Sequence, residues 1–163
     1  MVRTVAVTGA TGFIGSHVVG RLSADGWQVR VLTRRMPIHP VFAQASIEAV
    51  IGSLDDHDSL HRLIRGADAI VHAAGLIKAR SAAAFFKVNA TAVATLAGLA
   101  AAEPSPPRFI LLSSLAAREP TLSDYAASKR AGEEALAASG DRLAWTVLRP
   151  PAVYGPGDRE TLA

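Results

Sequence analysis

The chain has 163 residues, of which 50% are hydrophobic and 19% charged, and this composition is that of one globular domain rather than a disordered chain. It contains no cysteine, which excludes disulfides, thiolate catalysis and cysteine-ligated metal centres and fits a cytoplasmic protein. The formal net charge is +3, but the arginines are scattered, so we expect no nucleic-acid partner. We also expect no membrane span, because no apolar run approaches the roughly 18 residues that a bilayer requires.

Strand-like apolar segments alternate along the chain with segments of helical pattern. The sequence predicts six strands, at residues 2–8, 27–33, 47–51, 67–73, 108–113 and 143–148. It predicts helices at residues 13–25, 55–65, 81–103 and 123–139, and a proline-containing loop at 34–45. Such alternation is typical of a parallel sheet with right-handed crossovers. We therefore expect a doubly wound, Rossmann-like α/β fold of three layers, α/β/α, with strand order 3-2-1-4-5-6.

The first predicted strand runs directly into a glycine-punctuated turn, Gly9-Ala10-Thr11-Gly12-Phe13-Ile14-Gly15. Gly9 would permit a tight turn, Gly12 would let the backbone approach a pyrophosphate, and Gly15 would let the next helix pack closely. The N–H groups at the start of that helix would point at the anion. Because a strand precedes the turn and a helix follows it, the pattern favours a dinucleotide site over an unrelated glycine-rich turn.

Small and polar residues follow every predicted strand, and in a sheet of this type ligands bind at the carboxyl ends of the strands. These residues are Gly9 to Gly15, Arg34 and Arg35, Ser53 and Leu54, His72 to Gly75, Ser113 and Ser114, and Pro150 to Gly157. The sequence therefore predicts one functional rim. No grouping of His, Asp and Glu has the spacing of a metal site, so we expect no metal.

Tyr125 and Lys129 are four residues apart in a predicted helix and would share one face. A phenol, with a pKa of ~10, is a poor base at neutral pH, but a neighbouring ammonium favours the phenolate. Tyr125 could then exchange a proton with a substrate hydroxyl or carbonyl. A hydroxyl at Ser113 or Ser114 could hydrogen-bond the same substrate oxygen. A Tyr and a Lys four residues apart in a helix often occur by chance. The pair indicates an acid/base site here because a glycine loop and a strand that ends in Ser-Ser precede it in the chain.

Six motifs in this order resemble the short-chain dehydrogenase/reductase superfamily, most closely its extended and atypical branches of the epimerase/dehydratase type. They are Thr8 to Gly15 (TGxxGFIG), His72 to Gly75 (HxAG), Val88 to Thr91 (VNxxGT, departing around the usual glycine), Leu112 to Ser114, Tyr125 to Lys129 (YxxxK) and Leu148 to Gly157 (LRPxxVYGPG). Together they span almost the whole chain.

The resemblance implies catalytic roles for several of these residues. Tyr125 would be the acid/base, Lys129 would favour its phenolate and bind the ribose hydroxyls, and Ser114 would donate to the substrate oxygen, with Ser113 as the alternative. Asn89 would support a water- or backbone-mediated proton relay, or serve a structural role in its helix. The gap between the serines and Tyr125 is shorter than in most extended members, which leaves the choice of serine open and suggests a curtailed substrate loop.

The glycine loop and the resemblance together predict the cofactor-binding residues. These are Gly9, Thr11, Gly12, Phe13, Ile14, Gly15, Arg34, Arg35, Ser53, Leu54, Ala73, Ala74, Gly75, Lys129, Pro150 and Val153. A carboxylate after the second strand would select NAD(H), but Arg34 and Arg35 stand there, and a guanidinium suits a phosphate. We therefore expect NADP(H) rather than NAD(H), with two solvated arginines as the alternative. Ser53-Leu54 occupies the usual Asp-Leu position on the adenine side.

Extended members continue into a substrate-binding lobe after the last motif. We therefore expect residues 1–163 to form the dinucleotide-binding domain, with 150–163 as the start of a truncated substrate-binding region. Three functions follow: an NADP-dependent oxidoreductase acting on a small-molecule carbonyl or hydroxyl, a nucleotide-sugar epimerase or dehydratase using the same site, or a non-catalytic nucleotide-binding module. Relatives commonly dimerise through the helix that carries Tyr125. Ala126, Ala127 and Ala131 could pack against a second copy or within one chain.

Overall fold

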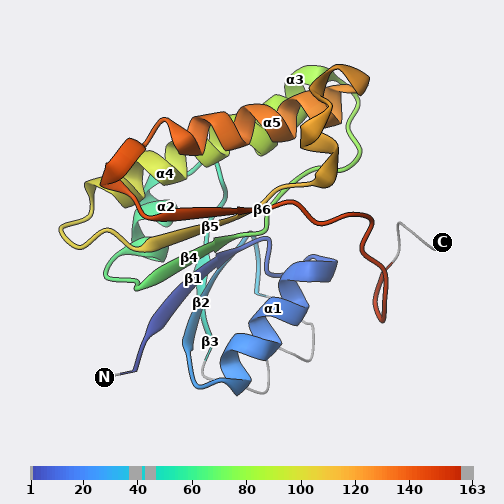
Figure 1. The fold of residues 1–163 in the computed structure, drawn as a ribbon. Helices are drawn as coiled ribbons and strands as arrows, with labels where there is room; N and C mark the ends of the chain where they lie inside the picture. Colours follow the sequence, from blue (N-terminus) through green and yellow to red (C-terminus); the bar gives the residue numbers. More distant parts are fainter. Residues whose placement is uncertain (1, 37–41, 43–46, 159–163) are drawn as a thin grey trace.

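The computed structural model describes residues 2–36, 42 and 47–158. A parallel six-stranded sheet in the order β3-β2-β1-β4-β5-β6 forms its centre (Figure 1). The strands are β1 (Thr4–Thr8), β2 (Gln28–Thr33), β3 (Ile47–Ile51), β4 (Ala69–His72), β5 (Arg108–Leu112) and β6 (Trp145–Leu148). The predicted fold class and strand order are confirmed. Most of the predicted loop at 34–45 lies outside the described residues.

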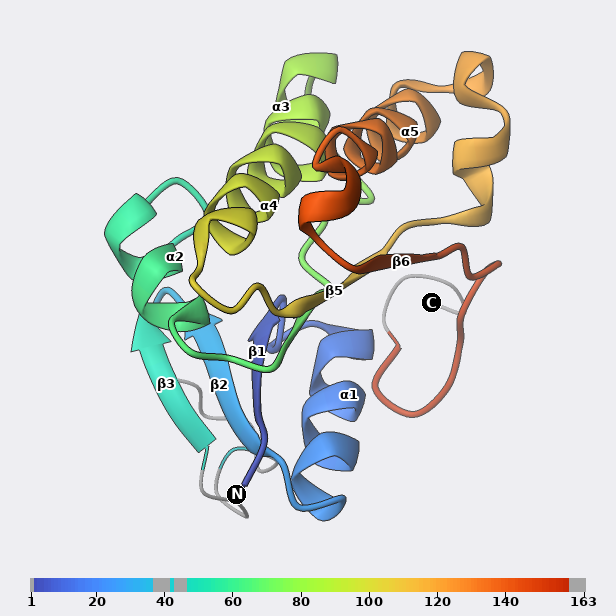
Figure 2. The same ribbon diagram turned by 60° about the vertical axis from the view of Figure 1, so that its left-hand side comes forward.

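Helices cover both faces of the sheet and give the three predicted layers (Figure 2). One face carries α1 (Phe13–Ala24). The other carries α2 (His57–Ile64), α5 (Asp124–Ala137) and a long helix made of α3 (Ala82–Phe86), η2 (Lys87–Thr91) and α4 (Ala92–Ala102). Short 3₁₀ turns η3 (Leu115–Arg118), η4 (Pro120–Leu122) and η5 (Gly140–Arg142) complete the connections.

Alternating side chains of the strands divide the core into two clusters, because successive residues of a strand point to opposite faces. Val5, Val7, Val29 and Val31 pack toward α1 around Val19. The opposite cluster contains Ile70 and Phe109 from the sheet and Leu60, Leu96 and Leu136 from the covering helices. Both layers therefore hold β1 and β4, the central pair of strands, in a fixed position.

The predicted helix at 81–103 contains a π-helical turn, η2, at Lys87–Thr91. As one helix, Ala82–Ala102 is 21 residues long with a mean hydropathy of 1.4, which by length and composition is enough to cross a membrane. The expectation that no apolar run approaches this length is therefore wrong. In the fold the helix lies beside α5 on one face of the sheet, and 28% of its most apolar window is buried (Figure 2).

Candidate nucleotide-binding and acid/base site

A groove of about 980 Å³ opens at the carboxyl ends of β1 to β4, where the strand order reverses. It is lined by Gly9, Thr11, Gly12, Leu32, Thr33, Arg34, Arg35, Met36, Gly52, Ser53, Leu54, Asp55, Ala73, Ala74, Gly75, Leu76 and Val88. Ten predicted cofactor residues are among them, namely Gly9, Thr11, Gly12, Arg34, Arg35, Ser53, Leu54, Ala73, Ala74 and Gly75. The remaining predicted residues, Phe13, Ile14, Gly15, Lys129, Pro150 and Val153, do not line it.

Sequence reasoning missed several lining residues that adjoin the predicted ones. Leu76 follows the HxAG turn and Val88 precedes Asn89, and these two place apolar surface on the groove wall. Both residues could have been predicted because each is adjacent in the sequence to a residue of a motif. Their side chains suit the flat, apolar faces of a nucleotide.

The turn after β1 depends on glycine at two positions. Gly9 has φ +70°, and a Cβ there would meet the backbone of Ala73 and Ala74. A Cβ on Gly15 would overlap the carbonyl oxygen of Gly9, so Gly15 lets α1 begin directly against the turn. Gly12 is extended, and its amide donates to the Gly9 carbonyl at 3.0 Å.

The start of α1 is open toward a ligand. Gly12 is its N-cap and supplies no side chain, so no side-chain acceptor satisfies the first amides of the helix. Bare backbone N–H groups and the positive end of the helix dipole suit a pyrophosphate. The site therefore fits the dinucleotide that the sequence predicts.

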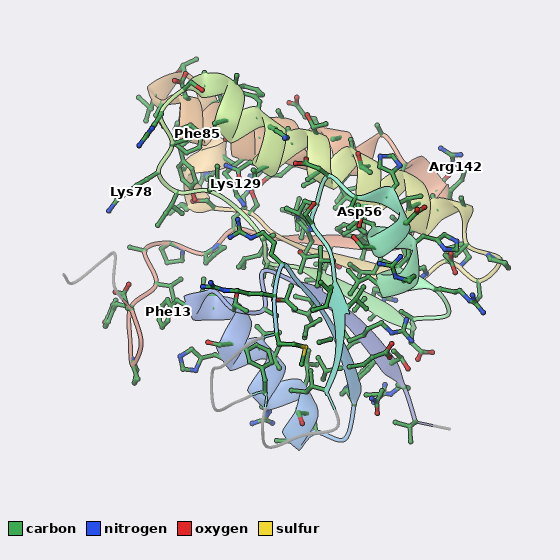
Figure 3. All side chains as sticks on the ribbon, turned by 180° about the vertical axis from the view of Figure 1, so that it is seen from behind. Phe13, Asp56, Lys78, Phe85, Lys129 and Arg142 are labelled. Atoms are coloured by element: carbon green, nitrogen blue, oxygen red, sulfur yellow. The ribbon has the colours of Figure 1, made fainter. Side chains whose placement is uncertain are left out.

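Phe13 faces away from the groove (Figure 3). Its ring packs edge-on against His17, with centroids 5.4 Å apart, and lies beside Gly155 and Gly157. The His17 ring nitrogen Nε2 is 2.9 Å from the Pro156 carbonyl oxygen. In this structure Phe13 therefore attaches the segment after β6 to α1.

Two exposed arginines follow β2. Arg34 and Arg35 line the groove, and the Thr33 hydroxyl donates to the Arg35 carbonyl at 2.5 Å. Among the described residues that line the groove, Asp55 alone carries a carboxylate, and it pairs with Lys87 at 2.8 Å. This edge of the groove is therefore cationic.

Tyr125 and Lys129 occupy one face at the start of α5. The Ser123 hydroxyl accepts from the Ala126 amide and fixes the first turn of the helix. The Tyr125 ring lies 6.0 Å from the ring of Phe85. Lys129 is buried, its ammonium donates to the Leu112 carbonyl at 2.7 Å, and a Cβ on Gly75 would stand 3.6 Å from its Nζ. The ammonium therefore lies next to the end of the groove (Figure 3).

Burial changes the charge of two groups here. It lowers the pKa of Lys129 to about 8, while the Glu133 carboxylate acts in the opposite direction. Burial, with a smaller effect of the Lys129 charge, lowers the pKa of His72 to about 3, so this imidazole is neutral. The His72 Nδ1 atom lies 2.9 Å from the Thr8 hydroxyl. Lys129 therefore holds its proton less strongly than an exposed lysine does.

The two candidate serines differ in their surroundings. Ser113 is buried, and its hydroxyl donates to the Glu133 carboxylate at 2.5 Å. Ser114 is half-buried and caps η3 by accepting from the Ala116 amide at 3.2 Å. Its hydroxyl hydrogen has no acceptor among the described residues. This arrangement favours Ser114 as the donor to a substrate.

Asn89 is buried, and its side-chain amide is engaged by protein atoms. Its Oδ1 accepts from the Leu76 amide at 2.9 Å, and its Nδ2 donates to the Leu76 carbonyl and the Ser128 hydroxyl at 3.0 Å each. The π turn η2 presents it to both partners, and such turns are frequent at functional sites. Of the two roles left open for Asn89, this geometry matches the structural one, in which it joins the groove wall to α5.

The remaining predictions concern alanines, metals and the residues after β6. Ala126 is buried, Ala127 and Ala131 are half-buried, and α5 packs against η2, α3 and α4, so contacts within the chain account for much of their surface. The Pro150 carbonyl accepts from the Leu115 amide at 2.9 Å, and Val153 is exposed. Within 2–36, 42 and 47–158, no group of three His, Asp or Glu side chains could hold a metal ion.

Comparison with known proteins identifies the family. The sequence pattern of the NAD dependent epimerase/dehydratase family matches residues 5–162. The chain belongs to this family. It is 52% identical to a ceramide reductase of Caulobacter vibrioides over 158 residues, which are 97% of this chain and 49% of that protein.

Further relatives agree with this assignment. A Streptomyces griseus (4-alkanoyl-5-oxo-2,5-dihydrofuran-3-yl)methyl phosphate reductase is 33% identical over 90% of this chain and 46% of its own length. The solved structure of the Bordetella bronchiseptica enzyme WbmH in complex with NAD⁺ superposes with a TM-score of 0.81 at 26% identity, covering 97% of this chain and 58% of that one. The chain thus spans about half the length of the curated relatives it matches. The resemblance to the dehydrogenase/reductase superfamily is confirmed, and the family supports a nicotinamide cofactor.

Proposed function

We propose that this chain carries the cofactor-binding and acid/base residues of an NADP-dependent oxidoreductase that reduces a carbonyl group. The buried Lys129 ammonium, on the helix face of Tyr125 and beside Gly75, is the observation that carries the proposal. The 52% identity to a reductase favours net reduction over an epimerase or dehydratase reaction at the same site. The alternative is a non-catalytic nucleotide-binding module, and the test below distinguishes it from an enzyme.

The groove residues each suit one part of the cofactor. Gly12 and the uncapped start of α1 would bind the pyrophosphate, and Arg34 with Arg35 would bind a 2′-phosphate. Ser53 and the neighbouring Leu54 would border the adenine. The bound dinucleotide would supply the hydride. Without a carboxylate after β2, no residue there would repel the phosphate of NADP(H).

The chain's own residues would handle the proton. As negative charge develops on the substrate oxygen, the Tyr125 hydroxyl would donate its proton to that oxygen. The Ser114 hydroxyl would donate a hydrogen bond to the same atom. The phenolate left on Tyr125 would be stabilised by the Lys129 ammonium. Asn89 would keep the Leu76 loop and α5 in register through its three hydrogen bonds.

We further propose that the substrate is a small molecule with an apolar chain. Ile77, Phe86, Leu115 and Leu122 are exposed apolar residues on the segments that flank Tyr125, namely the loop after β4, α3, η3 and η4. The Caulobacter relative, named a ceramide reductase, agrees with this chemistry. The absence of cysteine supports a cytoplasmic location.

The test combines cofactor binding with turnover. NADPH should raise the melting temperature more than NADH, and this difference should vanish in Arg34→Ala/Arg35→Ala. With a long-chain ketone, Tyr125→Phe should keep NADPH binding while kcat falls by at least about 100-fold. Tyr154→Phe, at the other tyrosine, which is 68% exposed, is the matched control and should retain wild-type kcat.

Each contrary result has one meaning. A larger shift with NADH contradicts the NADP assignment. Product formation without stoichiometric NADPH consumption would establish the epimerase or dehydratase reaction. Equal behaviour of wild type and Tyr125→Phe in every assay would leave the non-catalytic module.

A further inference from the structure

Glu133 lies one helical turn beyond Lys129 on α5, and none of the sequence motifs assigns it a role. It is 7% exposed, which is unusual for a carboxylate unless it is paired. The described structure pairs it with two groups that come from different strand ends. A buried charge held in this way needs an explanation beyond solubility.

The Glu133 carboxylate joins the carboxyl ends of β5 and β6 to α5. The Ser113 hydroxyl donates to Oε1 at 2.5 Å. Arg149 binds both oxygens, with Nε 2.9 Å from Oε1 and Nη2 2.5 Å from Oε2. The two strand ends also contact each other, because the Ser113 amide donates to the Leu148 carbonyl at 2.8 Å. Bidentate pairing of this kind fixes direction as well as distance.

This attachment gives the two candidate serines different surroundings. Ser113 is turned into the Glu133 carboxylate, so Ser114, the next residue, is turned elsewhere and begins η3. The same carboxylate holds Arg149, which directly precedes Pro150 and the segment that passes α1. Leu112, whose carbonyl accepts from Lys129, is the residue before Ser113. Glu133 therefore binds the residue that lies between Leu112, the hydrogen-bond acceptor of Lys129, and Ser114.

We propose that Glu133 is a positioning residue of the acid/base site: it ties Ser113 and Arg149 to α5, aims Ser114 toward the substrate oxygen, and keeps the neighbouring Lys129 in its charged form. The role rests on the proposed function for its effect on turnover. Its effect on Lys129 does not depend on any substrate.

The charges around Lys129 support this role. Burial raises the pKa of the Glu133 carboxyl, but hydrogen bonds from Arg149 and Ser113 outweigh burial and hold it below its usual value, so Glu133 is ionised. Burial lowers the pKa of Lys129 to about 8, and Glu133 opposes that change. His72 on β4 is neutral, Arg149, directly after β6, pairs with Glu133, and Arg130 on α5 pairs with Glu134. Glu133 is therefore the anion that favours the Lys129 ammonium.

Glu133→Gln and Glu134→Gln form a matched pair on adjacent residues of one helix. Each removes one carboxylate that pairs with an arginine, but the Glu134 side chain is 64% exposed whereas that of Glu133 is 8% exposed. The Arg149 side chain left behind in Glu133→Gln is 36% exposed and borders a cavity of about 410 Å³, so water can solvate it. The variant is therefore expected to fold.

The first readout is the ionisation of Lys129 in the substrate-free protein, followed by NMR of ¹³C-labelled lysine. The chain has three lysines, and Lys78 and Lys87 supply reference signals. The Lys129 titration midpoint should be lower in Glu133→Gln than in the wild type, because Glu133 favours the ammonium, and should be unchanged in Glu134→Gln. An unchanged midpoint in Glu133→Gln overturns the proposal.

The second readout is turnover. In Glu133→Gln kcat should fall about tenfold or more with NADPH affinity retained, because small displacements of reacting groups are costly. The falling basic limb of the pH–rate profile should move to lower pH together with the NMR midpoint. If Glu133→Gln does not fold, Glu133→Asp replaces it: a displaced carboxylate should lower kcat while the melting temperature stays near wild type, and an unchanged kcat overturns the proposal. Failure of the proposed function would abolish turnover in the wild type yet leave the difference in the Lys129 midpoint intact.

Discussion

The glycine loop after β1 lines the groove, and the Tyr125–Lys129 turn of α5 lies next to its end, but the two are built in opposite ways. In the loop, positions such as Gly9 and Gly15 leave no space for a side chain, and the binding groups are backbone amides. In the turn, the acting groups are side chains: Tyr125 is half-buried, and the buried Lys129 ammonium donates to the Leu112 carbonyl and is favoured by the Glu133 carboxylate. Substitutions that add a side chain should therefore disrupt the glycine loop, and substitutions that change a charge should disrupt the Tyr125–Lys129 turn.

Gly15→Ala should have the largest effect. Its Cβ would overlap the carbonyl oxygen of Gly9, which belongs to the backbone and cannot move aside without shifting the turn between β1 and α1. We expect a loss of unfolding free energy of more than about 3 kcal/mol and no detectable NADPH binding. Urea denaturation followed by circular dichroism measures the first, and fluorescence titration the second. A variant with wild-type stability would show that α1 can move away from the loop.

Gly12→Ala is the control that separates folding from binding. A Cβ there meets one protein atom, the Gly9 carbonyl oxygen, at 3.3 Å, and the φ of −79° suits alanine. The variant should fold with nearly wild-type stability, yet lose NADPH affinity because the methyl group would occupy the approach to the pyrophosphate. Tight NADPH binding by this variant would contradict the placement of the pyrophosphate at the start of α1.

The same contrast explains how much the sequence could predict. The alternation of strands and helices fixes the strand order, and the rule that ligands gather at carboxyl strand ends brought ten predicted residues to one groove. These features depend on local pattern. The ties of Glu133 to Ser113 and Arg149 link residues 20 and 16 positions away, and no local pattern encodes them. The hydrogen bonds of the Asn89 side chain to Leu76 and Ser128 likewise join residues that are distant in the sequence.

Two expectations from the sequence depend on surroundings that a local pattern does not contain. Phe13 was predicted to bind the cofactor; in the structure it does not line the groove, and its ring packs against His17 and beside Gly155, which is distant in the sequence. No apolar segment was expected to be long enough to span a membrane, whereas the alanine-rich helix Ala82–Ala102 is long and apolar enough by length and composition. A local motif or a composition count describes a residue without its surroundings, so neither could place these two segments in the fold.

Lys129→Met should have an intermediate effect whose sign depends on pH. Burial in the folded protein lowers the pKa of Lys129 to about 8, from the 10.5 of an exposed lysine, so between these values the unfolded chain binds more protons and wild-type stability rises with pH. Below about 8 the buried charge destabilises the fold. Methionine carries no charge, so the stability of the variant relative to wild type should decrease by on the order of 3 kcal/mol as pH rises across this window.

Urea denaturation at several pH values measures this difference. Lys87→Met is the matched control, because the Lys87 side chain is 61% exposed and its pairing with Asp55 is solvated. Its stability relative to wild type should not follow the same curve. A pH-independent difference for Lys129→Met would mean that Lys129 is not charged and buried at once, and would remove the basis for its role beside Tyr125.

Gly98→Ala should have the smallest effect, and the opposite sign to Gly15→Ala. Gly98 lies inside α4 with an exposed surface, and a Cβ there would meet nothing within 4 Å. Alanine restricts the unfolded chain more than glycine does, so the free energy of unfolding should rise by about 0.5–1 kcal/mol in urea denaturation, with NADPH affinity unchanged. A loss of stability instead would indicate that the outer face of α4 is covered in solution. An accompanying fall in molecular mass by light scattering would identify the cover as a second copy of the chain.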